Sequence, residues 1–200
     1  MIKKDKFFLI TALVILLVLS VFFGFKFFSC AGRVSGVRLK NAADELSVAN
    51  CGVQSIRSDF KEAHLSFVAV LSENNFNPGV KRAQNISNLT KVSTLYESSK
   101  KRISCIALTM PQSKYYPIEK ELFDLCNAFL NESKTLNKMV EDLTFGKNLT
   151  SVERAYLTQL DTLTNEFCKS LSDFDFSTNS TSQYIEKFKK IENELKKLSK

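Results

Sequence analysis

The chain has 200 residues and a formal net charge of +7, with 17 Phe, six Gly, three Pro and no Trp. Gly and Pro interrupt regular helices, so their scarcity favours an all-α fold. Residues 1–30 carry +3 of the charge and the other 170 residues only +4, which argues against the dense basic patch of a nucleic-acid-binding protein. We therefore expect no nucleic-acid partner.

An uncharged apolar run follows a basic N-terminus. Residues 7–25 are 19 residues without a charge, and three lysines precede them. About 20 apolar residues cross the ~30 Å hydrocarbon core of a bilayer, and lysines before the run favour a cytosolic N-terminus. The sequence therefore predicts the lipid bilayer as a partner and three segments: a cytosolic N-terminus at 1–6, a transmembrane signal anchor at 7–29 and an extracytoplasmic helical-bundle domain at 31–200.

Two other interpretations of the same segment remain open. Small residues at Ser29-Cys30-Ala31 would suit cleavage of a signal peptide. The sequence before Cys30 also resembles part of a bacterial lipobox, which makes Cys30 a candidate for lipidation. Phe27 stands there where such motifs usually have leucine. All three interpretations place residues 31–200 outside the cytosol.

The first predicted helix of the domain covers residues 37–72. Ten apolar residues recur along it at alternating intervals of three and four, which is the pattern of a helix that buries one seam as in a coiled coil. These residues are Leu39, Ala42, Leu46, Ala49, Val53, Ile56, Phe60, Ala63, Phe67 and Val70. His64 follows a seam position, and we interpret it as a solvated histidine on the helix surface.

Four further helices are predicted along the chain. Pro78 opens the second, which runs to about 110, and Pro117 opens the third, which ends near Leu143 before a chain break at residues 145–148. The apolar face of the second helix consists of Leu89, Val92, Leu95, Tyr96, Ile103, Ile106 and Met110. The seam of the third consists of Ile118, Leu122, Leu125, Phe129, Leu136, Met139 and Leu143, and Glu132 occupies one of its positions. Thr150 and Glu153 have the spacing of a capping box, so Thr150 should precede the fourth helix, whose apolar face includes Tyr156 and extends to Phe174. The last helix has apolar residues at 4,3,4,3 spacing, namely Tyr184, Phe188, Ile191, Leu195 and Leu198.

Short turns between the first four helices predict an antiparallel up-down four-helix bundle, coiled-coil-like in its packing. The last helix is then an additional C-terminal amphipathic helix. Its lysines would suit an anionic surface, but we favour packing along the bundle, with the lysines in water. The fold class is thus an N-terminal transmembrane helix followed by this bundle.

Four cysteines fall one in each bundle helix: Cys51, Cys105, Cys126 and Cys168. An even number in an exported domain predicts two disulfides. Counting residues from the turns places Cys51 near the height of Cys105 and Cys126 near the height of Cys168, so pairing within each hairpin is geometrically feasible. The pairs Cys51–Cys168 and Cys105–Cys126 also remain open, as do four thiols.

Five Asn-x-Ser/Thr sequons occur, roughly twice the number that chance predicts for this composition. Asn131, Asn148 and Asn179 are the candidates for N-glycosylation. Asn85 and Asn88 project onto the apolar face of their helix, where a glycan would oppose burial. An Asn- and Ser-rich composition alone is the competing explanation.

No pattern in the sequence indicates catalysis. His64 is the only histidine, no nucleophile motif surrounds it, and neither a CxxC pair nor a glycine-rich phosphate loop occurs. We therefore expect no enzyme activity, no metal site and no cofactor. The leading hypothesis is a structural or protein-interaction module at the cell envelope, with a protein partner or self-association.

The alternative is an extracytoplasmic ligand-binding or sensing helical domain. A sensor should have a cavity lined by polar groups that face inward. A module that binds proteins should have a filled core and exposed apolar residues.

Overall fold

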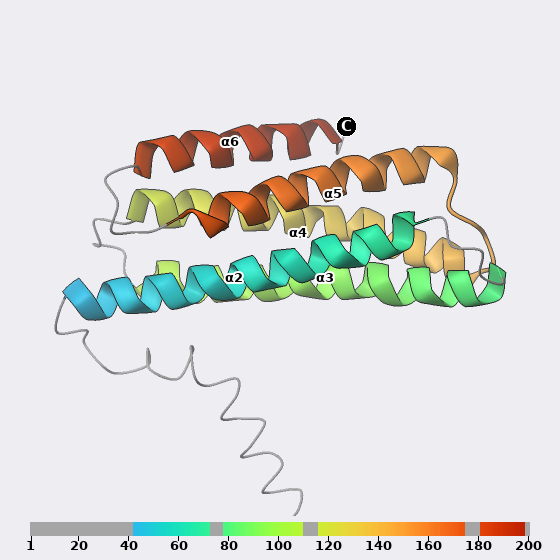
Figure 1. Ribbon diagram of the computed structural model, residues 1–200, viewed down its shortest axis with the longest axis horizontal. Coiled ribbons are helices and arrows are strands. Elements are labelled where there is room, and N and C mark those ends of the chain that lie inside the picture. The colour runs from blue at the N-terminus through green and yellow to red at the C-terminus, as the bar shows by residue number, and fades with distance from the viewer. Residues whose placement is uncertain (1–41, 73–77, 110–115, 175–180, 199–200) are drawn as a thin grey trace, which may run out of the picture. The chain divides into compact units, whose positions relative to one another are not determined.

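The computed structural model describes residues 42–72, 78–109, 116–174 and 181–198. Five helices account for nearly all of them: α2 (Ala42–Leu71), α3 (Pro78–Thr109), α4 (Tyr116–Thr144), α5 (Ser151–Ser172) and α6 (Thr181–Leu198) (Figure 1). The described ranges contain no strand, so the all-helical prediction is confirmed. These helices belong to a single unit, Asn41–Lys200.

The predicted anchor at 7–29 and the candidate lipidation site Cys30 lie outside the described residues. Among the helices that the structure describes, none is both long enough and apolar enough to cross a bilayer.

The start of α5 confirms the predicted capping box. The Thr150 hydroxyl accepts a hydrogen bond from the backbone N–H of Glu153 at 3.2 Å. In return, the Glu153 carboxylate accepts from the backbone N–H of Thr150 at 2.7 Å. A helix otherwise leaves its first N–H groups without partners, so these two bonds hold the first turn of α5 in place. Glycine suits the preceding turn because Gly146 has a φ of +90°.

The predicted apolar seams form the core. Buried seam residues recur on every helix, and among those predicted from the sequence are Val53, Ile56, Phe67, Leu89, Val92, Leu122, Leu125, Leu136, Leu160, Leu171, Ile191 and Leu195. On α5 the prediction was wrong by one position, because Leu157 is fully buried whereas Tyr156 is only partly buried. Tyr156 carries a hydroxyl that needs a polar partner, so it occupies the edge of the core.

Each helix contributes one aromatic ring to the middle of the core. The rings belong to Phe60, Tyr96, Phe129, Phe167 and Phe188, each at most 1% exposed. Phe60 lies 4.7 Å from Phe129 and 4.6 Å from Phe167 between ring centroids. Rings at such separations, mostly tilted or edge-to-face, fill volume and attract one another beyond their hydrophobic burial.

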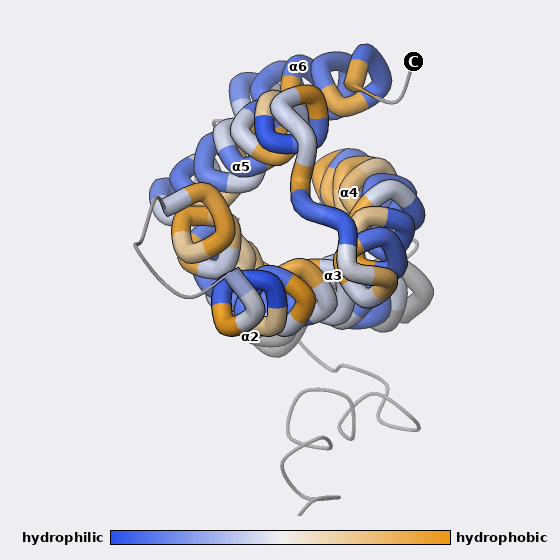
Figure 2. The backbone as a smooth tube through the Cα atoms, turned by 90° about the vertical axis from the view of Figure 1, so that its right-hand side faces the viewer, coloured by the Kyte–Doolittle hydropathy of each residue, from blue (hydrophilic) through white to orange (hydrophobic). Residues whose placement is uncertain are grey.

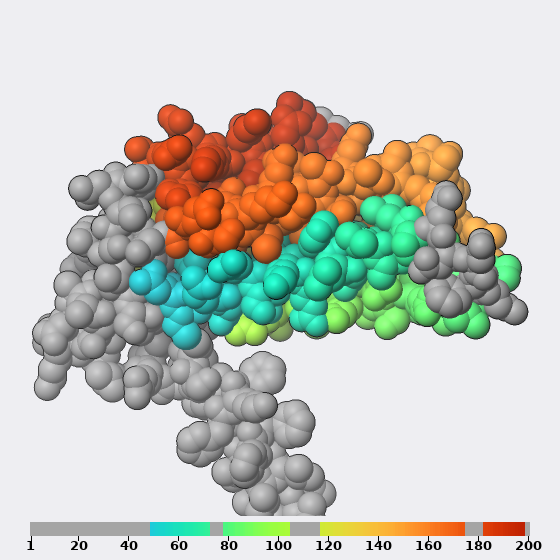
Figure 3. Space-filling model, viewed as in Figure 1, coloured from blue at the N-terminus to red at the C-terminus, as the bar shows by residue number. Residues whose placement is uncertain are grey.

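The helices follow one another in a closed ring when the bundle is viewed end-on (Figure 2). α2 packs against α3 and α5, α3 against α4, and α6 against both α4 and α5. In the view of Figure 3, α2, α5 and α6 lie side by side on one face. The sequence predicted a fifth helix laid along four others. The structure instead inserts α6 between α4 and α5, because its apolar residues Phe188, Ile191 and Leu195 are buried where it packs against these two helices.

Candidate functional site

Large exposed apolar side chains gather at one end of the bundle. Among the described residues they are Leu65 (58% exposed), Val68 (46%), Val80 (50%), Phe145 (76%) and Val152 (76%). They come from the last turns of α2, the first turn of α3, the α4–α5 loop and the first turn of α5. We call these five residues the apolar tip. The tip lies at the end opposite the start of α2.

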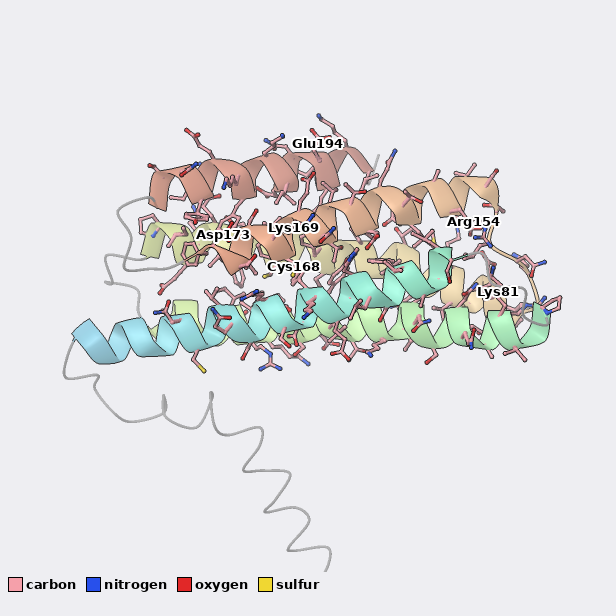
Figure 4. All side chains as sticks on the ribbon, viewed as in Figure 1. Lys81, Arg154, Cys168, Lys169, Asp173 and Glu194 are labelled. Atoms are coloured by element: carbon pink, nitrogen blue, oxygen red, sulfur yellow. The ribbon has the colours of Figure 1, made fainter. Side chains whose placement is uncertain are left out.

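Hydrogen bonds hold the segments of the tip together. Arg82 Nη2 on α3 donates to Asn148 Oδ1 in the α4–α5 loop at 3.2 Å. Lys81 Nζ donates to the carbonyl oxygen of Ser72 after α2 at 3.2 Å. Figure 4 shows Lys81 and Arg154 at this same end of the bundle. These bonds connect the start of α3 to the end of α2 and to the α4–α5 loop, so the segments that carry the tip are held to one another.

Charges of both signs surround the apolar tip. Basic side chains come from Lys81, Arg82, Lys147 and Arg154, and acidic ones from Glu141, Asp142 and Glu153. Lys147 Nζ lies 2.6 Å from Asp142 Oδ1, so these two charges compensate each other. Exposed apolar side chains in segments that also carry charges of both signs are typical of surfaces that bind proteins.

Buried polar pairs join the helices below the tip. On α2, Asp59 is 8% exposed and its Oδ2 accepts hydrogen bonds from Ser99 Oγ at 3.2 Å and Arg102 Nε at 3.1 Å on α3. The hydroxyl oxygen of Tyr96 on α3 lies 2.7 Å from Thr164 Oγ1 on α5. Since the Thr164 hydroxyl donates its only proton to the Leu160 carbonyl, Tyr96 is the donor to Thr164.

His64 is not the solvated surface histidine that we expected from the sequence. Its Nδ1 lies 2.7 Å from Asp161 Oδ1 on α5, and the two side chains are 27% and 16% exposed. Burial raises the pKa of Asp161 while the hydrogen bond and charge of His64 oppose that rise. The pair joins α2 to α5.

The carboxyl group of Asp59 makes stability depend on pH. Burial raises its pKa above the ordinary value of 3.8, and Arg102 only partly offsets that effect. A raised pKa means that the folded chain takes up a proton more readily than the unfolded chain, so Asp59 contributes stability as the pH falls toward 3.8. We expect the free energy of unfolding of the native chain to rise relative to that of Asp59→Asn between pH 7 and pH 4.

Denaturant unfolding of both proteins across this pH range tests the expectation, because the other carboxyl groups cancel in the difference. A difference that is constant with pH, or that changes in the opposite direction, would show that Arg102 dominates over burial.

A groove of about 190 Å³ lies between α4 and α6. Its lining includes Asp124, Asn127, Asn131, Glu132, Glu192 and Lys196. Glu132 is 3% exposed, and its Oε2 accepts a hydrogen bond from the Tyr156 hydroxyl at 2.6 Å. The sequence placed Glu132 at a seam position, and Tyr156 on α5 supplies the partner that such a buried carboxylate requires. The groove lies beside the core, which the aromatic rings fill.

The candidate disulfide residues differ in their surroundings. Cys126 is fully buried and Cys168 partly buried, and both are thiols in the structure. Burial raises the pKa of each, and the Cys168 thiol contacts the Arg57 carbonyl at 3.8 Å. Cys51 is exposed on α2, whereas the side chain of Cys105 lies outside the described residues. Disulfide formation by these cysteines stays a prediction.

The asparagines of the predicted N-glycosylation sites differ in how deeply they are buried. Asn85 is 5% exposed, so a glycan there is incompatible with the folded bundle, as its place on the apolar face indicated. Asn131 and Asn148 are exposed, and Asn179 lies outside the described residues. Glycosylation of these three remains a prediction.

Comparisons with known proteins add no family assignment. No protein-family model matches the chain, and no curated protein or solved structure is significantly similar to it. Within the described ranges, no group of three or more His, Cys, Asp or Glu side chains is placed to hold a metal ion.

Proposed function

We propose that this chain is a membrane-anchored, extracytoplasmic helical bundle that binds a protein partner through its apolar tip. The observation that carries the proposal is that the five large apolar side chains exposed among those the structure describes all belong to segments at one end of the bundle. Scattered apolar residues are normal on a protein surface, but a local group of them marks a contact site.

The anchor in this proposal is the uncharged run within residues 7–29. A lipid on Cys30 is an alternative anchor, and cleavage near Ala31 would instead release the bundle. Residues 1–41 precede α2, and Leu65 lies 23 residues after its start, or about 35 Å along the helix. The contact surface is thus well separated from the first residue of α2.

Two observations favour a protein over other occupants of the tip. The mixture of acidic and basic side chains around it would repel parts of a nucleic acid or of an anionic lipid surface. The core is filled by rings from all five helices, which supports a binding module ahead of a sensor that encloses a ligand.

Crosslinking of the full-length chain in intact cells tests both the topology and the tip. An amine-reactive crosslinker that does not cross membranes can reach Lys81 and Lys147 only if the bundle is outside the cytosol. We expect it to join the chain to a partner, and we expect Phe145→Ser combined with Val152→Ser to reduce that adduct several-fold. Both side chains are 76% exposed, so the bundle should remain folded.

The matched control replaces two exposed lysines away from the tip, Lys101→Ser and Lys187→Ser. These changes should leave the adduct intact. Absence of any adduct in the native chain, or an adduct of equal yield in the Phe145 and Val152 variant, would contradict the proposal.

A further inference from the structure

Asn148 carries an N-glycosylation signal in the loop that connects α4 to α5. Its sequon, Asn148-Leu149-Thr150, lies between the last residue of α4, Thr144, and the first residue of α5, Ser151 (Figure 1). Both Asn148 and Thr150 are exposed. Sequons that accept a glycan are expected in surface loops of exported proteins, and the sequon at Asn148 has this setting.

The other sequons among the described residues lie within helices. Asn85 and Asn88 are on α3, and Asn131 is on α4. Asn85 is 5% exposed, and Ser133, the hydroxyl residue of the Asn131 sequon, is 7% exposed. Within the described ranges, Asn148 therefore belongs to the sequon whose asparagine and hydroxyl residue are both exposed outside a helix.

Arg82 orients the side chain of Asn148. Arg82 Nη2 lies 3.2 Å from Asn148 Oδ1. A guanidinium group only donates hydrogen bonds, so the oxygen of the Asn148 amide, and not its nitrogen, must face Arg82. An N-linked glycan attaches to Nδ2 and leaves Oδ1 as an acceptor. The modification is therefore compatible with the hydrogen bond that holds α3 to the α4–α5 loop.

A glycan at Asn148 would be attached between two residues of the apolar tip. Phe145 precedes Asn148 by three residues and Val152 follows it by four, and both side chains are 76% exposed. An N-linked glycan is bulky and strongly solvated. It would keep a partner surface away from these two side chains, because apolar contact requires that water be removed from both surfaces.

We propose that Asn148 is N-glycosylated on the extracytoplasmic side and that the glycan blocks binding of the protein partner to the apolar tip. Copies with the glycan have a masked tip, and unmodified copies bind. The donor is a lipid-diphosphate-linked oligosaccharide. Nδ2 forms a bond to the first sugar and loses one proton, while the bond from that sugar to the diphosphate breaks and the diphosphate leaves with the bonding electrons. The inference rests on the extracytoplasmic location and the contact surface proposed above.

Mass spectrometry of the full-length chain from its native membrane tests the modification. Peptide N-glycosidase converts a glycosylated asparagine to aspartate, so part of Asn148 should be recovered as aspartate after digestion, and an undigested sample corrects for deamidation. Among the partner adducts of the amine-reactive crosslinker, those through Lys81 are informative, because Lys81 lies on α3 and not in the glycosylated loop. We expect glycan occupancy at Asn148 to be several-fold lower in these adducts than in chains without an adduct.

Two variants remove the sequon by different routes. Asn148→Gln removes the glycan acceptor. Thr150→Asn removes the hydroxyl residue but keeps Asn148 and supplies another side chain that caps helices well. Both variants should raise the yield of partner adducts several-fold. Asn131→Gln is the matched control and should leave the yield unchanged, because Asn131 lies 14 residues before Phe145, or about 21 Å along α4.

An Asn148 that is unmodified in every copy, or equally modified in adducts and in free chains, would overturn the inference. The partner adduct still forms in both of these outcomes. They therefore differ from failure of the proposed function, in which the native chain forms no adduct.

Discussion

Replacing Phe60 with alanine should lower the free energy of unfolding by about 3–5 kcal/mol. Phe60 is fully buried, and its ring contacts the rings of three other helices, Tyr96, Phe129 and Phe167. Alanine would leave a cavity on which three rigid rings converge, and such a site cannot collapse easily. The loss should be close to the upper end of what a single buried phenylalanine contributes.

Urea unfolding of the full-length chain in detergent, followed by far-ultraviolet circular dichroism, measures this change. Phe145→Ala is the matched control, because it removes the same side chain from a position that is 76% exposed. That variant should stay within about 0.5 kcal/mol of the native chain. Equal effects of the two substitutions would mean that the ring layer is not the centre of the core.

Phe188→Ala should cost about 3 kcal/mol or more if α6 is part of the core. Its side chain is 1% exposed and contacts Phe167, Phe174 and Tyr184. A helix that merely rested on a finished four-helix bundle would lose much less, because solvent would already reach part of the ring. The substitution therefore separates the observed arrangement from the one that the sequence favoured.

The same unfolding measurement serves for this second substitution, with Lys190→Ala as its control. Lys190 is exposed on α6, and alanine favours helix formation, so the control should be neutral within about 0.5 kcal/mol. A cost below about 1 kcal/mol for Phe188→Ala would contradict the placement of α6 between α4 and α5.

Local patterns predicted the helices well because they depend on neighbours in the chain. The 3,4 spacing around Phe60 and Phe129 identified core positions that are fully buried. Thr150 and Glu153 identified the start of α5, and Pro78 the start of α3. Each of these signals involves residues within one or two turns, where the geometry of a helix leaves few alternatives.

Relations between distant helices were harder to predict. Nothing near His64 in the sequence indicates Asp161, which is 97 residues away and meets it only because α2 packs against α5. The insertion of α6 between α4 and α5 was missed for the same reason. The sequence pattern of an amphipathic helix is the same whether the helix lies on the surface of a bundle or between two of its helices. Phe145 was correctly placed at a chain break, but its membership of the apolar tip depends on which helix ends meet.

The polar pairs between helices have a consequence for the register of the bundle. Seams of Leu, Ile, Val and Phe resemble themselves after a shift of seven residues, about 10 Å along a helix. The carboxylate of Asp59 and the hydroxyl of Tyr96 meet their partners on α3 and α5 in one alignment only. A slipped bundle would bury these groups without partners, at about 1–3 kcal/mol for each neutral group and more for the charge. The apolar residues make the helices associate, and the few buried polar residues fix the register in which the helices pack.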